Sequence, residues 1–289
     1  MPLTVIKGSY RIVGAAPDGD SIRFYPTQTD AFTKAGVRNV RTNATGGAQL
    51  RLDAIDALET HYSPRVGGLG ELHQPARYGN DAAERLPQVL GFTSVTRGDN
   101  QVVTASEPDA TPGYILTRFA DKYGRCVAFA FPGDIDQDDL KPMFVDAAAV
   151  DTSANAGMLT AGLAYPTYYS KLFPDLRNAL TDAVNGARAE KRGIWADDVT
   201  QTGVKVESLS TLTDDAVILP KLFRRLVDYI ALNHGDVDMR GFSTYLATVD
   251  DRLILTTTSS MTGFDNVLTV ADQTVTLTQP PENLIFIEG

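Results

Sequence analysis

Short runs that combine β-branched and aromatic residues recur through the first half of the chain. They lie at positions 9–16, 21–26, 48–55, 101–106, 113–120 and 124–133, and Gly, Pro or Asp residues separate them. Such runs are typical of β-strands, and the Asp18-Gly19 pair between the first two predicts a hairpin. Five or six short strands with little helix between them predict a small barrel or sandwich.

Three segments in the same part of the chain have helical spacing. Residues 79–91 predict a helix with Asn80 as N-cap, which Pro87 should kink or shorten. Residues 155–165 predict a short second helix. The clearest helix runs from Pro174 to about Arg192 and ends at Gly193. Its apolar residues recur every three or four positions: Phe173, Leu176, Leu180, Val184 and Ala187.

A separate pattern begins after residues 201–213, which resemble a linker or a crossing strand. Pro220 opens a helix that Gly235 closes, and its apolar stripe comprises Leu222, Phe223, Leu226, Val227 and Ile230. A short helix at 242–247 and the strand-like runs RLILT, NVLTVA, TVTLT and LIFIE follow. We therefore predict two domains, residues 1–200 and a small α+β domain of unknown role at 201–289.

Composition limits the class of protein. The 289 residues are 43% apolar and 21% charged, which is ordinary for a soluble globular chain. No apolar run has the roughly 18 residues of a membrane span, and no signal peptide is recognisable, so we expect a cytoplasmic protein; secretion after removal of a leader stays open. Cys126 is the only cysteine and there are three histidines, which disfavours disulfides and zinc.

The net charge of −10 disfavours a protein that coats nucleic acid through bulk positive charge. Residues 1–198 carry a net charge of −4 and residues 199–289 a net charge of −6. Binding to a polyanion must therefore come from local clusters and not from the overall field. For the second part we expect packing against the first part or against a protein partner, without direct nucleic-acid binding.

Three segments carry residues suited to phosphodiester chemistry: DGDS at 18–21, RLDAIDALE at 51–59 and DKYGR at 121–125. Strand alternation alone would place Arg51 and Asp56 on opposite faces. The strand should end near Asp56, however, so that a bulge or turn can bring Arg51, Asp56 and Glu59 together. Taken singly, each segment also fits an ordinary turn or strand end.

The residue types in these segments match the needs of phosphodiester hydrolysis. Carboxylates hold a hard cation that neutralises charge on the phosphate. Two guanidiniums bind phosphate oxygens in a fixed bidentate geometry, which a lysine ammonium does not. A further carboxylate orients or deprotonates the attacking water.

The three segments are followed by a predicted helix at 155–165, which contains Gly-Leu-Ala, and by a last helix that ends in Gly-Ile-Trp. In this order they resemble the staphylococcal nuclease (thermonuclease) family. The resemblance spans about residues 7–198. It implies an α+β fold, a five-stranded OB-fold barrel with three helices. It also implies a calcium-dependent endonuclease that hydrolyses DNA and RNA and leaves 3'-phosphate ends.

The resemblance also assigns roles to residues. Asp20 and Asp56 match the Ca²⁺ ligands, with the carbonyl of Ala57 as a third ligand, and Asp18 matches a supporting acid. Glu59 matches the general base. The remaining matches are two phosphate-binding arginines, Arg51 and Arg125, and the residues that flank the nucleotide, Lys122, Tyr123 and either Tyr168 or Tyr169.

The chain departs from the family pattern in three places. Ala57-Leu58-Glu59 replaces the usual Thr-Pro-Glu, which leaves the turn before the proposed base less stiff. Two inserted loops, 26–48 with Lys34, Arg38 and Arg41 and 60–78 with His61 and His73, either contact substrate or are simply solvated.

Three functions remain open at this point. The first is an active calcium nuclease that acts on DNA or RNA. The second is a catalytically silent nuclease-like binding module. In the third possibility, residues 205–289 act as an interaction domain that delivers the nuclease to a partner. Retention of Asp20, Arg51, Asp56, Glu59 and Arg125 favours the first.

Overall fold

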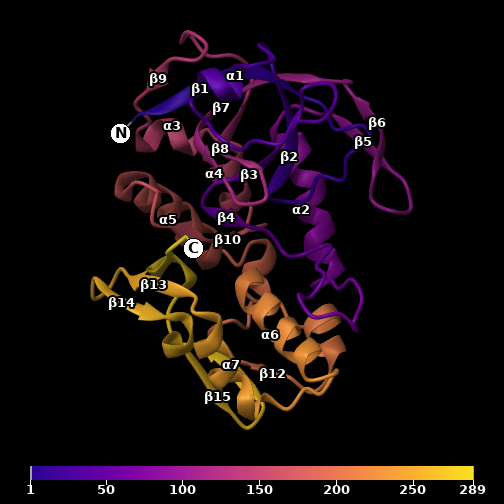
Figure 1. The fold of residues 1–289 in the computed structure, drawn as a ribbon, viewed down its shortest axis with the longest axis vertical. Helices are drawn as coiled ribbons and strands as arrows, with labels where there is room; N and C mark the ends of the chain where they lie inside the picture. Colours follow the sequence, from indigo (N-terminus) through magenta and orange to yellow (C-terminus); the bar gives the residue numbers. More distant parts are fainter. Residues whose placement is uncertain (1, 289) are drawn as a thin grey trace.

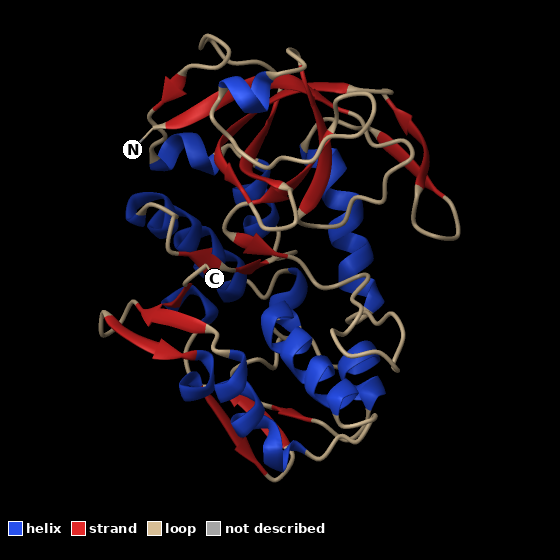
Figure 2. Ribbon diagram, in the orientation of Figure 1, coloured by secondary structure: helices blue, strands red, loops and turns tan. Residues whose placement is uncertain are grey.

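A computed structural model describes residues 2–288. The barrel lies at the top of Figure 1 and the C-terminal elements lie below it, with α5, β4 and β10 between them. The C-terminus returns to the middle of the molecule, beside α5. Figure 2 shows that strands dominate the upper part, whereas helices and short strands alternate in the lower part.

Five strands close into a barrel, as predicted for an OB-fold. They are β1 (Leu3–Tyr10), β2 (Ser21–Pro26), β3 (Ala48–Leu52), β7 (Thr111–Ala120) and β8 (Cys126–Pro132). The order is β2-β3-β8-β7-β1, and pairing of β1 with β2 closes the ring. Within this barrel β3 and β8 pair in parallel, and the other neighbouring strands pair antiparallel. The short β9 (Pro142–Met143) extends the sheet beyond β1.

Two strand predictions need correction. The run at 9–16 is mostly loop, because the first strand ends at Tyr10, whose buried hydroxyl donates to backbone carbonyls of β7 and β8. The residues after Tyr10 form the loop that carries DGDS. The run at 101–106 lies outside the barrel, where β6 (Val103–Glu107) pairs with β5 (Ser94–Arg97) as a separate ribbon.

The three predicted helices are confirmed as α2 (Ala76–Val89), α4 (Ala154–Thr160) and α5 (Pro174–Ala189), and the short α1 (Ala31–Lys34) and α3 (Ala147–Asp151) were not predicted. Helix α2 begins before Asn80, so Asn80 is not its N-cap. Pro87 lies in the last turn of α2 and lacks the N–H that would bond the carbonyl of Ala83. Nη2 of Arg97 donates to that carbonyl instead, over 2.8 Å.

The C-terminal part contains the predicted elements and one more strand. Its α-helices are α6 (Pro220–Leu232) and α7 (Phe242–Val249). Its strands are β12 (Val204–Lys205), β13 (Arg252–Leu255), β14 (Ser260–Gly263), β15 (Leu268–Ala271), β16 (Thr274–Leu277) and β17 (Leu284–Phe286). The sequence did not predict β14. Short 3₁₀ helices lie at Gly193–Ala196, Met239–Gly241, Phe264–Val267 and Pro281–Asn283, and a π-helical turn lies at Thr211–Asp215.

The C-terminal part is joined to the first part by backbone pairing, a salt bridge and a shared core. Strand β17 pairs in parallel with β11 (Tyr168–Tyr169). Nη1 and Nη2 of Arg188 donate to the Glu282 carboxylate, at 2.6 and 2.8 Å. One cluster of buried apolar residues runs through both parts. Within residues 2–288, no helix is both long enough and apolar enough to cross a membrane.

Asn155 connects α4 to the barrel. Its side chain is fully buried; it accepts from the amide of Ala130 at 3.1 Å and donates to the carbonyl of Asp53 at 2.8 Å. We predict that Asn155→Ala lowers the free energy of unfolding by roughly 3 kcal/mol, because both backbone groups lose their partners. Denaturant titration measures this. Asn185→Ala, at an exposed position of α5, is the control and should change stability by less than about 0.5 kcal/mol. Equal stability of the two variants would contradict the role of Asn155.

Candidate active site

A turn directly after β3 sets the direction of the acidic residues. Ala54 has a left-handed backbone with φ of 70°, which ends the barrel strand. The chain then forms β4 (Ile55–Asp56), which pairs with β10 (Tyr165–Pro166) outside the barrel. Strand alternation is broken here, so that Arg51 and Asp56 approach each other, as the sequence predicted.

The DGDS loop lies against this turn. The amide of Ala57 donates to Oδ2 of Asp20 at 3.3 Å, and Oδ1 of Asp18 accepts from the Asp20 amide at 3.2 Å. A Cβ on Gly19 would lie 2.5 Å from the Cβ of Ala82 in α2 and 2.6 Å from the Cβ of Ala57. Only glycine therefore allows the loop to pack this closely between α2 and the turn.

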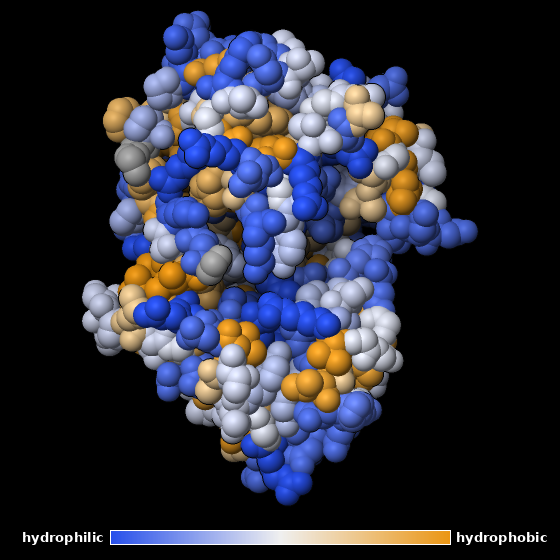
Figure 3. Space-filling view, in the orientation of Figure 1, coloured by the Kyte–Doolittle hydropathy of each residue, from blue (hydrophilic) through white to orange (hydrophobic). Residues whose placement is uncertain are grey.

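These segments form one wall of a cleft of about 790 Å³. The C-terminal part forms the opposite wall, with residues of α6, of the segment 249–251 and of the chain end at 287–288. In Figure 3 a band of hydrophilic residues crosses the middle of the molecule between the two parts. The cleft lining includes most of the predicted site: Asp18, Asp20, Arg51, Asp56, Ala57, Glu59, Lys122, Tyr123, Arg125 and Tyr169.

Two arginines contact the carboxylates at the base of the cleft. Nη1 of Arg51 lies 3.8 Å from Oδ2 of Asp20, and its Nη2 lies 3.6 Å from Oδ1 of Asp56. Arg224 of α6 donates from Nη2 to Oδ2 of Asp56 at 2.5 Å and from Nη1 to Oδ1 at 3.4 Å, and its Nη1 also bonds Glu59. Asp56 is 1% exposed and Asp20 is 8% exposed, so both acids are almost removed from water.

Burial and the neighbouring charges act on these acids in opposite directions. Burial favours the neutral form of Asp56, but Arg224 and Arg51 overcome it and hold the pKa of Asp56 at about 2. Burial and repulsion from Asp18 raise the pKa of Asp20 well above its ordinary value. Burial also raises the pKa of Glu59, against the attraction of Arg224. The cluster has more acids than cations, which favours entry of a further positive charge.

Arg125 lines the cleft but is not in contact with the carboxylate cluster. Its Nε donates to Oδ2 of Asp121 at 2.7 Å, and its guanidinium lies 5.7 Å from the centre of the Tyr123 ring. Nζ of Lys122 lies 5.5 Å from the centre of the same ring. The DKYGR turn therefore presents two cations and an exposed aromatic ring to the cleft.

The two tyrosines of β11 point in different directions. Tyr168 is fully buried, its hydroxyl lies 3.0 Å from that of Thr181 in α5, and it does not line the cleft. Tyr169 does line the cleft. Of the two candidates for packing on a nucleotide, the geometry supports Tyr169 alone. In the inserted loops, His61 lines the cleft, whereas His73 and residues 26–48 do not.

Sequence reasoning missed the basic residues of α6. Lys221, Arg224 and Arg225 all line the cleft, although the net charge of −6 led us to expect no direct nucleic-acid binding by the C-terminal part. The net charge did not reveal this local basic cluster. Positions 221, 224 and 225 share one face of a helix, so their i, i+3, i+4 spacing was the available signal.

Comparison with known protein families identifies the family of the chain. The family model described as "Staphylococcal nuclease homologue" matches residues 49–197. The chain belongs to the staphylococcal nuclease homologue family. The family match covers Arg51, Asp56, Glu59 and Arg125; Asp20 precedes it and Arg224 follows it. No curated protein matches the chain.

The donor chemistry of the cleft fits the hard cation that this family implies. The candidate ligands are oxygens only, from two buried carboxylates and the Ala57 carbonyl, as Ca²⁺ prefers. Among residues 2–288, no three His, Cys, Asp or Glu side chains are grouped as a metal site, so a carbonyl or water ligands would have to complete the set. The guanidinium of Arg224 bonds both oxygens of Asp56, so a cation that bound this carboxylate would have to displace at least one of these contacts.

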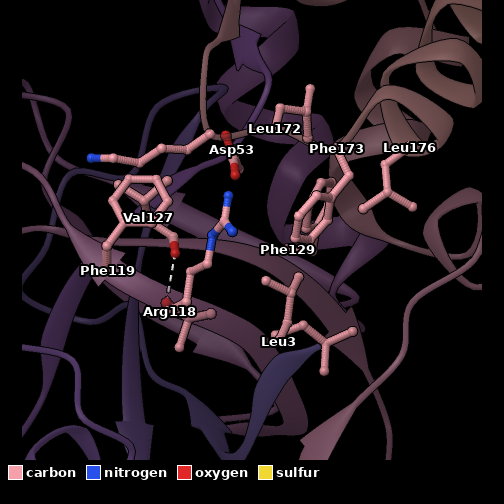
Figure 4. A pocket seen from close by; sticks show the side chains of 12 residues that line it. Leu3, Asp53, Arg118, Phe119, Val127, Phe129, Leu172, Phe173 and Leu176 are labelled. Atoms are coloured by element: carbon pink, nitrogen blue, oxygen red, sulfur yellow. Dashed lines mark hydrogen bonds between the residues drawn. The ribbon is translucent and has the colours of Figure 1, made fainter. Parts of the chain in front are cut away.

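A second, much smaller cavity lies behind the cleft wall and is mostly apolar. It measures about 10 Å³ and is lined by Leu3, Phe129, Leu176 and other residues of the barrel and α5. Figure 4 shows Asp53 and Arg118 pointing toward one another across it, with Phe173 alongside. Burial raises the pKa of Asp53 to about 6. This space is large enough for about one water molecule and too small for a substrate.

Gly19 should be intolerant of a side chain. We predict that Gly19→Ala lowers the free energy of unfolding by about 1–3 kcal/mol, because the new methyl group overlaps Ala57 and Ala82. Thermal or chemical unfolding checks this. Gly67→Ala is the matched control, since a Cβ there meets nothing within 4 Å and its φ is not positive. If Gly19→Ala is as stable as Gly67→Ala, the close approach is not a constraint.

Proposed function

We propose that this chain is a calcium-dependent nuclease that hydrolyses phosphodiester bonds in DNA and RNA. The observation that carries the proposal is the gathering of Asp20, Asp56, Glu59 and Arg51 at the base of one cleft. Membership of the nuclease family supports it. The size of the cleft supports it as well, because a volume of about 790 Å³ is in the range of ligand sites and accommodates a short stretch of nucleic acid.

Each residue of the cleft has a proposed task. Arg51 binds two oxygens of the scissile phosphate with its guanidinium fork. Glu59 accepts a proton from the attacking water and aligns it with phosphorus. Asp20, Asp56 and the carbonyl of Ala57 hold Ca²⁺, which when bound neutralises charge that develops on the phosphate oxygens. Burial of the two aspartates strengthens these electrostatic interactions.

The rim of the cleft contributes to substrate binding in this proposal. Tyr169 offers a ring face for a base, and stacking on an aromatic ring is tolerant of sequence. Lys122, Tyr123 and Arg125 bind the backbone beside the reacting phosphate. These contacts are available in both DNA and RNA, because none of them reads the 2'-hydroxyl or a base edge.

Cleavage assays with single-stranded DNA, plasmid DNA and RNA test the proposal. We expect cleavage with Ca²⁺ and none with excess chelator. Arg51→Ala and Glu59→Ala should each lower kcat/KM by at least 100-fold, a typical loss when one transition-state contact is removed.

Matched controls separate a loss of catalysis from the effect of removing any charged side chain. Arg85→Ala and Glu71→Ala alter exposed residues away from the cleft and should retain full activity. All variants are first compared by thermal unfolding. Folded wild-type chain that binds nucleic acid but never cuts it with Ca²⁺ would instead identify a silent binding module.

The ends of the products give an independent prediction. Attack of water on phosphorus with cleavage of the P–O5' bond, as the family implies, leaves a 3'-phosphate and a 5'-hydroxyl. The 5' ends of the fragments should therefore accept radiolabelled phosphate from a polynucleotide 5'-kinase without prior dephosphorylation. Fragments that require dephosphorylation first would show the opposite bond cleavage.

A further inference from the structure

The basic side of α6 faces the acidic centre of the cleft. Arg224 bonds both Asp56 and Glu59, the proposed metal ligand and the proposed base. Its side chain is 22% exposed, so one side contacts the acids while another remains open to the cleft. No other residue of the C-terminal part bonds this pair among the residues that the structure describes.

Helix α6 is firmly attached. Arg225 bonds Asp251 at 2.5 and 2.9 Å, and Lys221 bonds the same carboxylate at 3.1 Å. From the first part of the chain, the Tyr62 hydroxyl donates to Asp228 at 2.9 Å. The apolar face of α6 is buried in the common core. The backbone at Arg224 is therefore fixed, and only the side chain is free to change partner.

The position of Arg224 also complements that of Arg125. Arg125 is engaged by Asp121 at the rim, so the guanidiniums that flank the buried acids come from Arg51 and Arg224. These two approach Asp56 from different segments of the chain. Since both contact Asp56, a phosphate placed beside Asp56 would lie within reach of both.

We propose that Arg224 is a substrate-binding residue that grips the scissile phosphate together with Arg51, so that the C-terminal part completes the active site. Without substrate, the guanidinium pairs with Asp56 and Glu59. When a phosphate enters, the guanidinium of Arg224 rotates to bind the phosphate oxygens. This frees the carboxylates of Asp56 and Glu59 for the roles proposed above. Carboxylate and phosphate suit the same planar fork, so the exchange keeps a bidentate contact. This inference rests on the proposed nuclease function.

Binding without divalent ions tests the contact separately from catalysis. The probe is a fluorescent single-stranded hexathymidylate in excess chelator, titrated over a series of salt concentrations. Arg224→Ala should weaken binding at least tenfold and reduce the slope of log K against log salt by about 0.7, the value for one lost phosphate contact on a single strand. Arg240→Ala is the control: its side chain is 90% exposed and away from the cleft, and both quantities should match wild type.

A second variant guards against misfolding. Arg224→Lys keeps the positive charge beside Asp56 and should fold, but lacks the fork; we expect kcat/KM for Ca²⁺-dependent cleavage to fall at least tenfold. If Arg224→Ala unfolds, this variant decides. Binding and cleavage equal to wild type in both variants would overturn the inference. Faster cleavage would also overturn it, because Arg224 would then inhibit the site instead of binding substrate. Absence of cleavage by wild type would count against the nuclease function, while the binding series would still judge Arg224.

Discussion

The cleft depends on the need of buried carboxylates for positive charge. Asp56 is removed from water, and an ionised carboxylate in that position is costly unless a cation is in contact with it. Arg51 and Arg224 meet this need and hold the pKa of Asp56 at about 2. In the proposed function, a Ca²⁺ ion or a phosphate that enters the cleft has to exchange with these contacts. The proposal therefore links binding of the metal, binding of substrate and the stability of the cleft through Asp56.

The fold brings these charges together by interrupting regular structure twice. The left-handed turn at Ala54 takes the chain off the barrel, and the absence of a side chain at Gly19 lets the loop with Asp20 approach Ala57. Both features lie at the end of barrel strands, where the backbone is no longer bound to its sheet partners. The barrel then acts as a rigid base, and α6 supplies the facing wall of the cleft.

Local signals predicted much of this arrangement. Alternation and β-branched residues located β2, β3, β7 and β8, and Pro174 and Pro220 marked the starts of two helices. The residues near the acids were found because they lie in short motifs. Arg224 was not, because its partner Glu59 lies 165 positions away and no local pattern encodes such a contact. Likewise, pattern alone did not decide between Tyr168 and Tyr169, since alternation puts one side chain inside without saying which.

A crystal structure with Ca²⁺ and a short oligonucleotide whose scissile linkage resists hydrolysis would test the central claim most directly. The account predicts an ion between Asp20 and Asp56, and a phosphate held by Arg51 and Arg224, with the guanidinium of Arg224 no longer on Asp56. An oligonucleotide bound elsewhere, with Arg224 still on Asp56 and Glu59 and no ion between the two aspartates, would contradict it.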